Sequence, residues 1–409
     1  MTVKTHRLSN GLTIAVEPMP GVETLAVGLY ADAGSRSEPA GLSGLAHMLE
    51  HMVFKGAGSR DARAIAEAIE DKGGSINAWT ARDHTVFHTR MLGGDLALGL
   101  DLIADLVRDP HLKADELERE KDVVLSELGE ARDTPDDIIF DHLSAAAFAD
   151  QPMGLPVLGD EASIAAIDST ALRRWIDEQY RPDRLVIAAA GKVDEDELLK
   201  IAEQRFGDLA TDPAPGYTPA TFTSGTRHDR RNFDQLHLSF AFPAPAYRED
   251  GLHAMALWAS AVGGGMSSRL FQELREERGL AYSIYSWAQA FGDTGMFGVY
   301  CAAQQDKGAE AFALARDVLA RAAETLDEAE LARAKAQAKA GLLMGLESVA
   351  TRCDYLARQV QIHGRVVPPS ETVALIDAVT VQAARAAGQA ALSGPMAVAS
   401  VGGKLARVA

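Results

Sequence analysis

The sequence predicts a mixed fold, α+β or α/β, in two or three domains. Its 409 residues allow that number at roughly 100 to 200 residues per domain. Hydrophobic residues make up 47% of the chain and charged residues 24%, which is typical of globular proteins and excludes disordered and fibrous classes. Short β-rich runs alternate with longer helical patterns in the first half, and this alternation indicates the mixed class.

Strands are predicted at residues 12–17 and 24–31, where short apolar runs are rich in β-forming residues. Helices are predicted at residues 95–107 and 114–130, because apolar side chains recur there at three- and four-residue spacing. Residues 211–226 (TDPAPGYTPATFTSGT) contain three prolines among small polar residues, the composition of an extended connector. We therefore predict a first domain over residues 1–210, a linker over 211–226 and a second domain over 227–409.

The second half is predicted to repeat the first. The run ELEREK at residues 116–121 aligns with ELARAK at 330–335, an offset of 214 residues, and each run lies in a long helical pattern. A strand-like run closes each half, at 185–192 and 396–403, with an offset of 211 when Gly191 is set against Gly402. This ordered self-similarity favours two homologous domains.

Charge and cysteine content exclude several classes of function. The formal charge of −18 would repel a nucleic-acid backbone, so we expect no nucleic-acid partner. No apolar run approaches the roughly 18 residues of a membrane span, and the start of the chain has no apolar signal region. We expect a cytoplasmic protein without a membrane anchor. Cys301 and Cys353 do not form a CxxC pair, so we expect two inert thiols.

The strongest motif is H-x-x-E-H at residues 47–51. On a helix, His47 and His51 project from the same face and can converge on one metal ion, while Glu50 lies beside that ion as a candidate general base. Leucines and methionines at core-facing spacing over residues 42–53 support the helix, and Gly56 is expected to end it. The composition gives an expectation of about 0.02 chance occurrences of this motif.

A zinc site needs a third protein ligand, and two glutamates are candidates. Glu120 and Glu127 are seven residues apart in the predicted helix, so both lie on one face. One of them can bind the metal while the other orients a ligand or a substrate group. The spacing alone does not choose between them.

The chain resembles the pitrilysin or insulysin-type zinc peptidases, in particular the two-domain branch that includes the β subunit of mitochondrial processing peptidase and bacterial relatives. The resemblance runs through most of the chain. It is carried by SNGLTIAVEP (residues 9–18), GLAHMLEHMVFKG (44–56), GGSINAWTARDHTVF (73–87), EREKDVVLSEL (118–128) and GLPVLG (154–159). It implies an α+β fold of two homologous domains, each a mainly antiparallel β-sheet packed with helices.

The resemblance also implies roles for single residues. His47, His51 and Glu127 would be the zinc ligands, Glu50 the general base and Glu120 a carboxylate that supports the ligands. Relatives often have about 76 residues between the second histidine and the ligand glutamate, whereas 75 intervene here, which a one-residue loop deletion explains.

Two further elements would contact the substrate. The segment Asn77, Ala78, Trp79 and Thr80 resembles the edge strand with which the family pairs an extended peptide. The second half has no metal ligands at the 214-residue offset, but its block SSRLFQELREERGLAYSIYS (267–286) resembles the family's Arg and Tyr element. Arg275 and Tyr282 would hydrogen-bond the substrate carbonyl and its oxyanion.

Together these features predict a zinc endopeptidase with one Zn²⁺ per chain that cleaves unfolded peptides, with a preference for basic residues. Two alternatives stay open, a non-catalytic peptide-binding subunit and a zinc hydrolase of a small molecule. Because one chain carries both the zinc motif and the Arg and Tyr element, we expect a homodimer whose sites are shared between chains. A heterodimer with an inactive paralogue is the alternative assembly.

Overall fold

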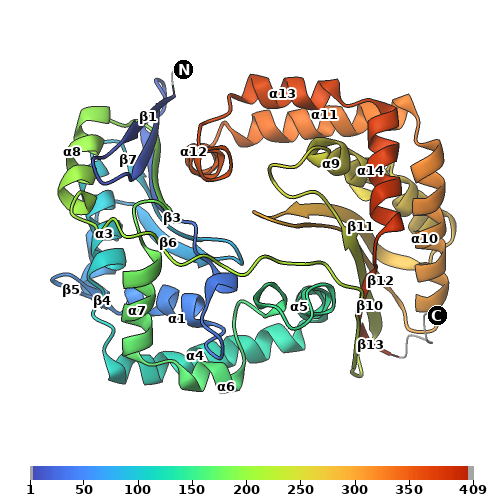
Figure 1. The fold of residues 1–409 in the computed structure, drawn as a ribbon, viewed down its shortest axis with the longest axis horizontal. Coiled ribbons are helices and arrows are strands. Elements are labelled where there is room, and N and C mark those ends of the chain that lie inside the picture. The colour runs from blue at the N-terminus through green and yellow to red at the C-terminus, as the bar shows by residue number, and fades with distance from the viewer. Residues whose placement is uncertain (1–2, 404–409) are drawn as a thin grey trace. The chain divides into compact units, whose positions relative to one another are not determined.

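The computed structural model describes residues 3–403 and divides into two compact units (Figure 1). Unit 1 comprises the chain up to Leu128, Pro156–Thr218 and Leu343–Val367. Unit 2 comprises Gly129–Leu155, Pro219–Leu342 and the chain from Pro368 onward. Each unit has its own sheet and its own apolar core.

Unit 1 is built on a six-stranded sheet in the order β1-β2-β8-β3-β7-β6. Every neighbouring pair is antiparallel except β2 and β8, which run parallel. The strand β6 pairs with β7 and forms one edge of the sheet. The strands are β1 (Lys4–Arg7), β2 (Thr13–Pro18), β3 (Thr24–Ala31), β6 (Ser75–Thr80), β7 (Thr85–Leu92) and β8 (Leu185–Gly191).

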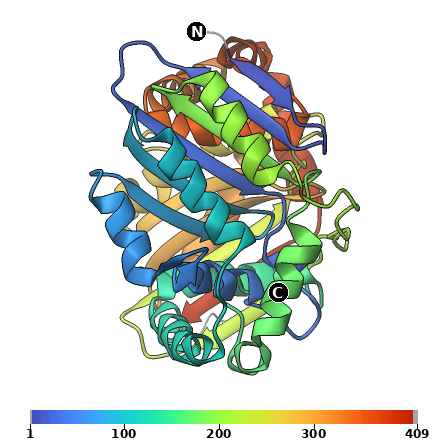
Figure 2. The same cartoon turned by 90° about the vertical axis from the view of Figure 1, so that its left-hand side faces the viewer.

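Helices cover one face of this sheet with the larger apolar core of the unit, and Figure 2 shows several of them in front of the strands. The β-rich runs form strands here because their alternate apolar side chains enter this core. The elements of this layer are η1 (Ser35–Ser37), α1 (Leu45–Val53), β4 (Gly56–Ala57), β5 (Arg60–Asp61), α2 (Ala62–Glu70), α3 (Leu96–Arg108), α4 (Ala114–Asp133), α6 (Glu161–Ala166), α7 (Ser169–Gln179) and α8 (Glu195–Phe206).

Unit 2 repeats this plan with a five-stranded sheet in the order β11-β12-β10-β13-β9. The pair β13 and β9 is parallel, as β8 and β2 are in unit 1, and the other pairs are antiparallel. The strands are β9 (Thr226–Arg230), β10 (Gln235–Pro243), β11 (Ala281–Ala290), β12 (Gly295–Gln304) and β13 (Ala397–Gly402). The helical elements are α9 (Leu252–Gly263), the π-helical η3 (Phe271–Glu277), α10 (Gly308–Thr325), α11 (Glu328–Gly345), α13 (Pro369–Ala378) and α14 (Val381–Ser393).

The two halves of the chain exchange one helix. The helix α12 (Val349–His363), from the second half, packs against β8, β3 and β2 of unit 1 and covers the second face of that sheet. The helix α5 (Pro135–Ala147), from the first half, packs against β13, β10 and β9 of unit 2 with the short η2 (Pro152–Gly154) beside it. Each unit therefore contains one helix that belongs to the other half of the sequence.

The predicted α+β class is confirmed, and so is the internal repeat. The strand predicted at residues 24–31 has those bounds, and α4 begins at residue 114 and α11 at residue 328, which is the predicted offset of 214. Residues 211–225 form neither helix nor strand. Among the described residues, no helix combines the length and the apolar character needed to cross a bilayer.

Candidate metal centre

The helix α1 holds the H-x-x-E-H motif with its apolar side inward. Leu45, Met48, Leu49 and Met52 are buried in the core of unit 1, whereas the polar residues of the motif lie on the less buried side. This division follows from the helical period, since residues three and four apart share a face. The helix ends at Val53, and the backbone of Gly56 has a φ of 139°, a conformation that favours glycine.

A carboxylate from outside the helix caps the start of α1. The first residue before the helix, Gly44, has a φ of 91° and no side chain to cap it. Glu38 instead accepts hydrogen bonds from the backbone N–H of Gly44 at 2.9 Å and of Ala46 at 2.8 Å. These bonds satisfy donors that a helix start leaves free, and they fix the direction in which α1 leaves the preceding loop.

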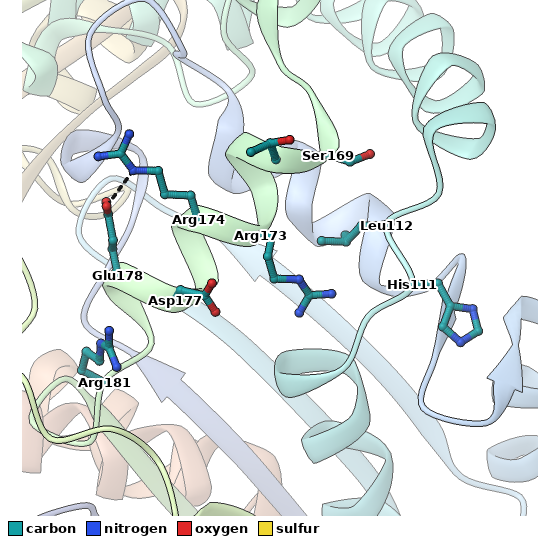
Figure 3. Close-up of a pocket in the computed structure, with 9 residues that line it drawn as sticks. His111, Leu112, Ser169, Arg173, Arg174, Asp177, Glu178 and Arg181 are labelled. Carbon is teal, nitrogen blue, oxygen red and sulfur yellow. Dashed lines mark hydrogen bonds and ion pairs between the residues drawn. The ribbon is translucent and has the colours of Figure 1, made fainter.

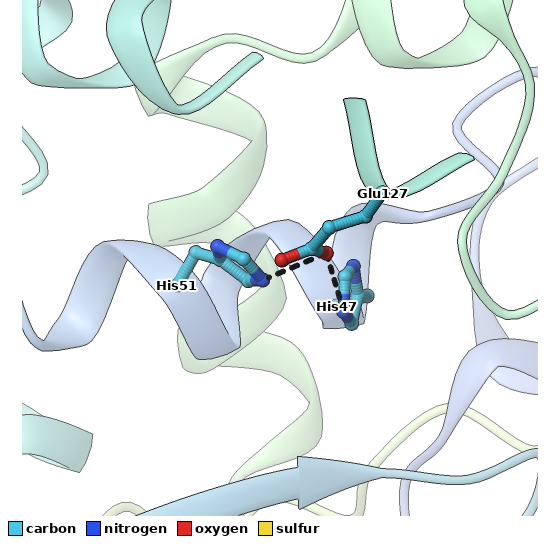
Figure 4. A group of neighbouring side chains, drawn as sticks. All are labelled: His47, His51 and Glu127. Carbon is cyan, nitrogen blue, oxygen red and sulfur yellow. Dashed lines mark ion pairs between the residues drawn. The ribbon is translucent and has the colours of Figure 1, made fainter. Parts of the chain in front are cut away.

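His47, His51 and Glu127 converge at the polar side of α1 (Figure 4). One potential ligand atom from each lies within 4.8 Å of the others. Glu127 Oε2 is 3.8 Å from His47 Nε2 and 3.4 Å from His51 Nε2. Ligands bound at about 2.0 to 2.2 Å in a tetrahedral zinc site lie roughly 3.4 Å apart, so the donor atoms fit a zinc ion.

The protonation of His47 also suits a metal ligand. Burial, and secondarily the neighbouring His51, lowers the pKa of His47 to about 4. Its imidazole is therefore neutral near pH 7 and has a free lone pair, as metal binding requires.

The two candidate glutamates occupy different places. Glu127 reaches both histidines, whereas Glu120 is 5% exposed and contacts the other ring nitrogen of His51, with Oε2 at 3.1 Å from Nδ1. The second oxygen of Glu120 pairs with Lys55 Nζ at 2.7 Å. A carboxylate on Nδ1 leaves Nε2 to face the cluster, which is the usual arrangement around a histidine ligand. The geometry therefore supports Glu127 as the ligand and Glu120 as the residue that orients His51.

Glu50 lies between the two histidines in sequence and has one carboxylate oxygen, Oε2, that is buried without a hydrogen-bond partner among the described residues. Burial raises the pKa of this carboxyl, and the nearby negative charge of Glu127 raises it further, while Thr80 and His51 oppose the shift. A carboxylate with a raised pKa in such a setting can exchange a proton with a reacting group.

The predicted peptide-binding segment lies at the sheet edge. Asn77, Ala78, Trp79 and Thr80 belong to β6, which among the described strands pairs with β7 alone. Ala78 is buried, whereas Trp79 is 39% exposed and packs edge-on against His84 at a centroid distance of 4.8 Å. Thr80 lies close enough to Glu50 to lower the pKa of its carboxyl, so the end of this edge strand is close to the motif.

Unit 2 carries the other predicted residues. Arg275 is exposed on η3 and stacks over the Phe271 ring at 4.8 Å, and Tyr282 is 54% exposed on the edge strand β11. Gly279 between them has a φ of 58°, as a turn-forming glycine requires. The described part of unit 2 contains no second group of three potential metal ligands.

The structure adds residues that the sequence analysis did not select. Lys55 follows His51 by four residues. This spacing was the signal in the sequence that Lys55 could lie near His51, since residues four apart are neighbours along a helix. Glu38 gave no comparable signal. A pocket of about 540 Å³ lies along α7 and contains none of the predicted site residues (Figure 3). Cys301 and Cys353 are both buried, and burial raises the pKa of each thiol to about 12, in agreement with inert cysteines.

Comparisons with known proteins show the family of the chain. Residues 13–161, which include His47, His51 and Glu127, match the family described as insulinase, peptidase family M16. Residues 166–338 match a domain described as the peptidase M16 inactive domain. A protein of Mycobacterium tuberculosis, named as an uncharacterized zinc protease, is 37% identical over 94% of this chain and 90% of its own length.

The chain belongs to peptidase family M16. A zinc protease of Bacillus subtilis, also named as uncharacterized, is 31% identical over 93% of both chains. Two solved structures share the fold with a TM-score of 0.89. One is a peptidase M16 inactive domain from Pseudomonas fluorescens, 23% identical over 100% of this chain and 99% of its own. The other is a protease from Helicobacter pylori, 20% identical over 98% of this chain and 99% of its own.

Proposed function

We propose that this M16 chain is a zinc-dependent endopeptidase that hydrolyses unfolded or extended peptides. The convergence of His47, His51 and Glu127 beside Glu50 is the observation that carries the proposal. One zinc ion per chain, held by these three residues, would polarise the scissile carbonyl and acidify a water molecule. The sequence and the family support zinc over other metals.

The side chains of this chain divide the remaining work. Glu50 accepts a proton from the attacking water and later returns it to the leaving amine. Glu120 keeps the imidazole of His51 in position through Nδ1. The free edge of β6 offers backbone N–H and C=O groups to an extended peptide, so binding depends little on the peptide's side chains.

Metal analysis followed by digestion of a mixed peptide library tests this function. We expect close to one zinc ion per chain and peptide cleavage that a chelator abolishes. Zinc binding with hydrolysis of small esters or amides but not of peptides would instead support a small-molecule hydrolase. Zinc and peptide binding without any hydrolysis would support a non-catalytic subunit, which the intact H-x-x-E-H motif disfavours.

We also propose a homodimer in which each site is shared between chains. Both half-sites occur in one sequence, the zinc motif on α1 and the pair Arg275 and Tyr282 in unit 2. In the shared arrangement, Tyr282 and Arg275 of one protomer hydrogen-bond the substrate carbonyl held at the motif of its partner. A chain that stays monomeric and inactive until a paralogue is added would indicate a heterodimer instead.

Subunit exchange between two inactive variants tests the shared site. Glu50→Gln and Tyr282→Phe are prepared separately and mixed under conditions where subunits exchange. A mixed dimer has one site with an intact Glu50 from one chain and an intact Tyr282 from the other, so activity should return in part. No recovery despite demonstrated exchange would contradict the shared site.

The charge of the protein supports a preference for peptides with basic residues. The net charge of −18 favours the approach of cationic peptides and slows that of anionic ones. Cleavage profiling at low and high salt checks this preference, and equal rates on acidic and Arg-containing peptides would remove it. The cytoplasmic location stays a prediction from the sequence.

A further inference from the structure

Lys55 lies just beyond the C-terminal end of α1, where it meets a buried carboxylate. Its Nζ is 2.7 Å from Glu120 Oε1, while Glu120 Oε2 is 3.1 Å from His51 Nδ1. The three side chains thus form a chain of contacts from Lys55 through Glu120 to Nδ1 of His51. Among the described residues, Lys55 is the one Lys or Arg that forms an ion pair with Glu120.

The surroundings of Glu120 make this pair different from a surface salt bridge. The Glu120 side chain is 6% exposed, and burying a carboxylate is costly unless a cation or hydrogen-bond donors compensate its charge. Exposed pairs, by contrast, contribute little because water screens both partners. Lys55 therefore supplies the compensating charge at a place where solvent does not.

The backbone holds Lys55 in this place. Its N–H donates to the Met52 carbonyl at 3.1 Å, which continues the turn that closes α1. The next residue, Gly56, has a positive φ and lies against the His111 ring. A Cβ added at this position would lie 2.4 Å from His111 Nδ1. A residue with a side chain would not fit at position 56, so the chain turns there and leaves Lys55 beside α4.

We propose that Lys55 is a positioning residue for the metal centre and acts through Glu120 on His51. With Lys55 bound to Oε1, the carboxylate keeps Oε2 on His51 Nδ1, so the ring presents Nε2 toward His47 and Glu127. The inference rests on the proposed zinc site and adds to it a residue that contacts neither metal nor substrate.

Zinc affinity provides the main test, measured by competition with a chelator on the full chain. Removing a partner of a metal ligand usually weakens metal binding by about 10- to 100-fold, and we expect roughly tenfold for Lys55→Met. Lys55→Arg keeps the positive charge and should retain most of the affinity. Lys192→Met is the matched control, since Lys192 forms a 2.6 Å pair with the exposed Glu23 and should leave zinc affinity unchanged.

A double-mutant cycle separates positioning from general destabilisation. In a Glu120→Gln background, Lys55→Met should have little further effect on zinc affinity, because its route to His51 is already broken. The absorption spectrum of the Co²⁺-loaded protein should also change in Lys55→Met and be restored in Lys55→Arg. Thermal unfolding of the metal-free proteins shows whether each variant folds, and Lys55→Gln replaces Lys55→Met if that variant does not.

The outcomes distinguish the two proposals. If the unmodified chain binds neither zinc nor cobalt, both the proposed metal centre and the proposed role of Lys55 are wrong. If the unmodified chain binds zinc and Lys55→Met binds it within about twofold, only the role of Lys55 is overturned. An equal loss in the Glu120→Gln background, or in Lys192→Met, would overturn it as well.

Discussion

The helices α1 and α9 occupy the same place in the two units and have different uses. Each follows the central strand of its sheet, β3 or β10, and each begins after a glycine with a φ close to 90°. With these two glycines aligned, an offset of 207 residues, His47 and His51 correspond to the buried Ala254 and Trp258. The helices α4 and α11 begin 214 residues apart, which sets Glu127 against Gly341. The same scaffold thus holds a group of three potential metal ligands in unit 1 and none among the described residues of unit 2.

The two helices differ in how much of their surface is buried, and this explains the difference. In α1, one side enters the core and the other presents the potential metal ligands, whereas α9 is buried along most of its length, including the fully buried Trp258. Gly388 of α14 packs so closely on Trp258 that an added Cβ would lie 2.4 Å from the indole. Unit 2 uses its helix for packing, which shows that a fold provides positions and that side chains decide their chemistry.

The largest expected effect comes from replacing Glu50, the proposed general base, which has no counterpart in unit 2. Glu50→Gln should lower peptide hydrolysis by about 10² to 10⁴, because an amide cannot accept the proton, while zinc content stays unchanged. Steady-state cleavage and metal analysis measure the two properties. Glu70→Gln, on the exposed side of α2, is the matched control. Activity above about one hundredth of the original would mean that another group is the base.

The next largest effects are expected from the proposed metal ligands. His51→Ala and Glu127→Gln each remove one of these ligands, so zinc should be lost at concentrations that saturate the unmodified chain. Glu120→Gln should weaken binding by about 10- to 100-fold without abolishing it. Equilibrium dialysis against zinc ranks the three variants by their zinc affinity. Normal binding by Glu127→Gln together with loss in Glu120→Gln would reverse the assignment of the two glutamates.

A smaller effect is expected at the Glu38 carboxyl that caps the start of α1. Burial raises the pKa of Glu38 to about 8 from an ordinary value of 4.5. The folded state then binds the proton more tightly than the unfolded state, so the contribution of Glu38 is complete below pH 4.5 and is lost as the pH rises to 8.

Unfolding by denaturant between pH 4.5 and 8 checks whether the contribution of Glu38 to stability decreases as the pH rises. The free energy of unfolding of the unmodified chain should fall relative to Glu38→Gln between pH 4.5 and 8, by at most about 1.4 kcal/mol per pH unit. A constant difference over the range would show that the pKa of Glu38 is not raised. Metal-free protein is used for both, so that zinc binding does not contribute.

The smallest expected effect is that of transplanting the ligands into unit 2. Placing histidines at positions 254 and 258 and glutamates at 257 and 341 should leave the zinc content at that of the unmodified chain. The reason is that Leu257 and Trp258 are buried in the core of unit 2, so side chains at these positions would not be free to bind a metal. An additional zinc ion per chain would show that this side of α9 can serve as a metal site.

Local patterns in the sequence predicted much of the fold and of the site. The spacing of His47 and His51 placed both rings on one face, because this depends on the helical period alone. The apolar spacing that supported the helix begins at residue 42, whereas α1 begins at Leu45, because Gly44 and the Glu38 cap set the first turn. Glu127 needed the family resemblance, since its contact with α1 joins distant segments.

Tertiary packing accounts for what was missed. The contact of Lys55 with Glu120 joins residues whose separation carries no periodic signal, although Lys55 stands one helical turn after His51. The exchange of α5 and α12 was not predicted either. An amphipathic pattern shows which side of a helix is buried, but it does not show which sheet the helix covers.

That exchange has a consequence for synthesis on the ribosome. The sheet of unit 1 buries Ala15, Tyr30 and Ala188 beneath Cys353 and its neighbours in α12. This cover is translated more than 150 residues after β8, the last strand of that sheet. A nascent chain that has completed the H-x-x-E-H half still exposes an apolar sheet face, so the order of translation links the completion of the unit that carries the proposed metal site to the arrival of the second half.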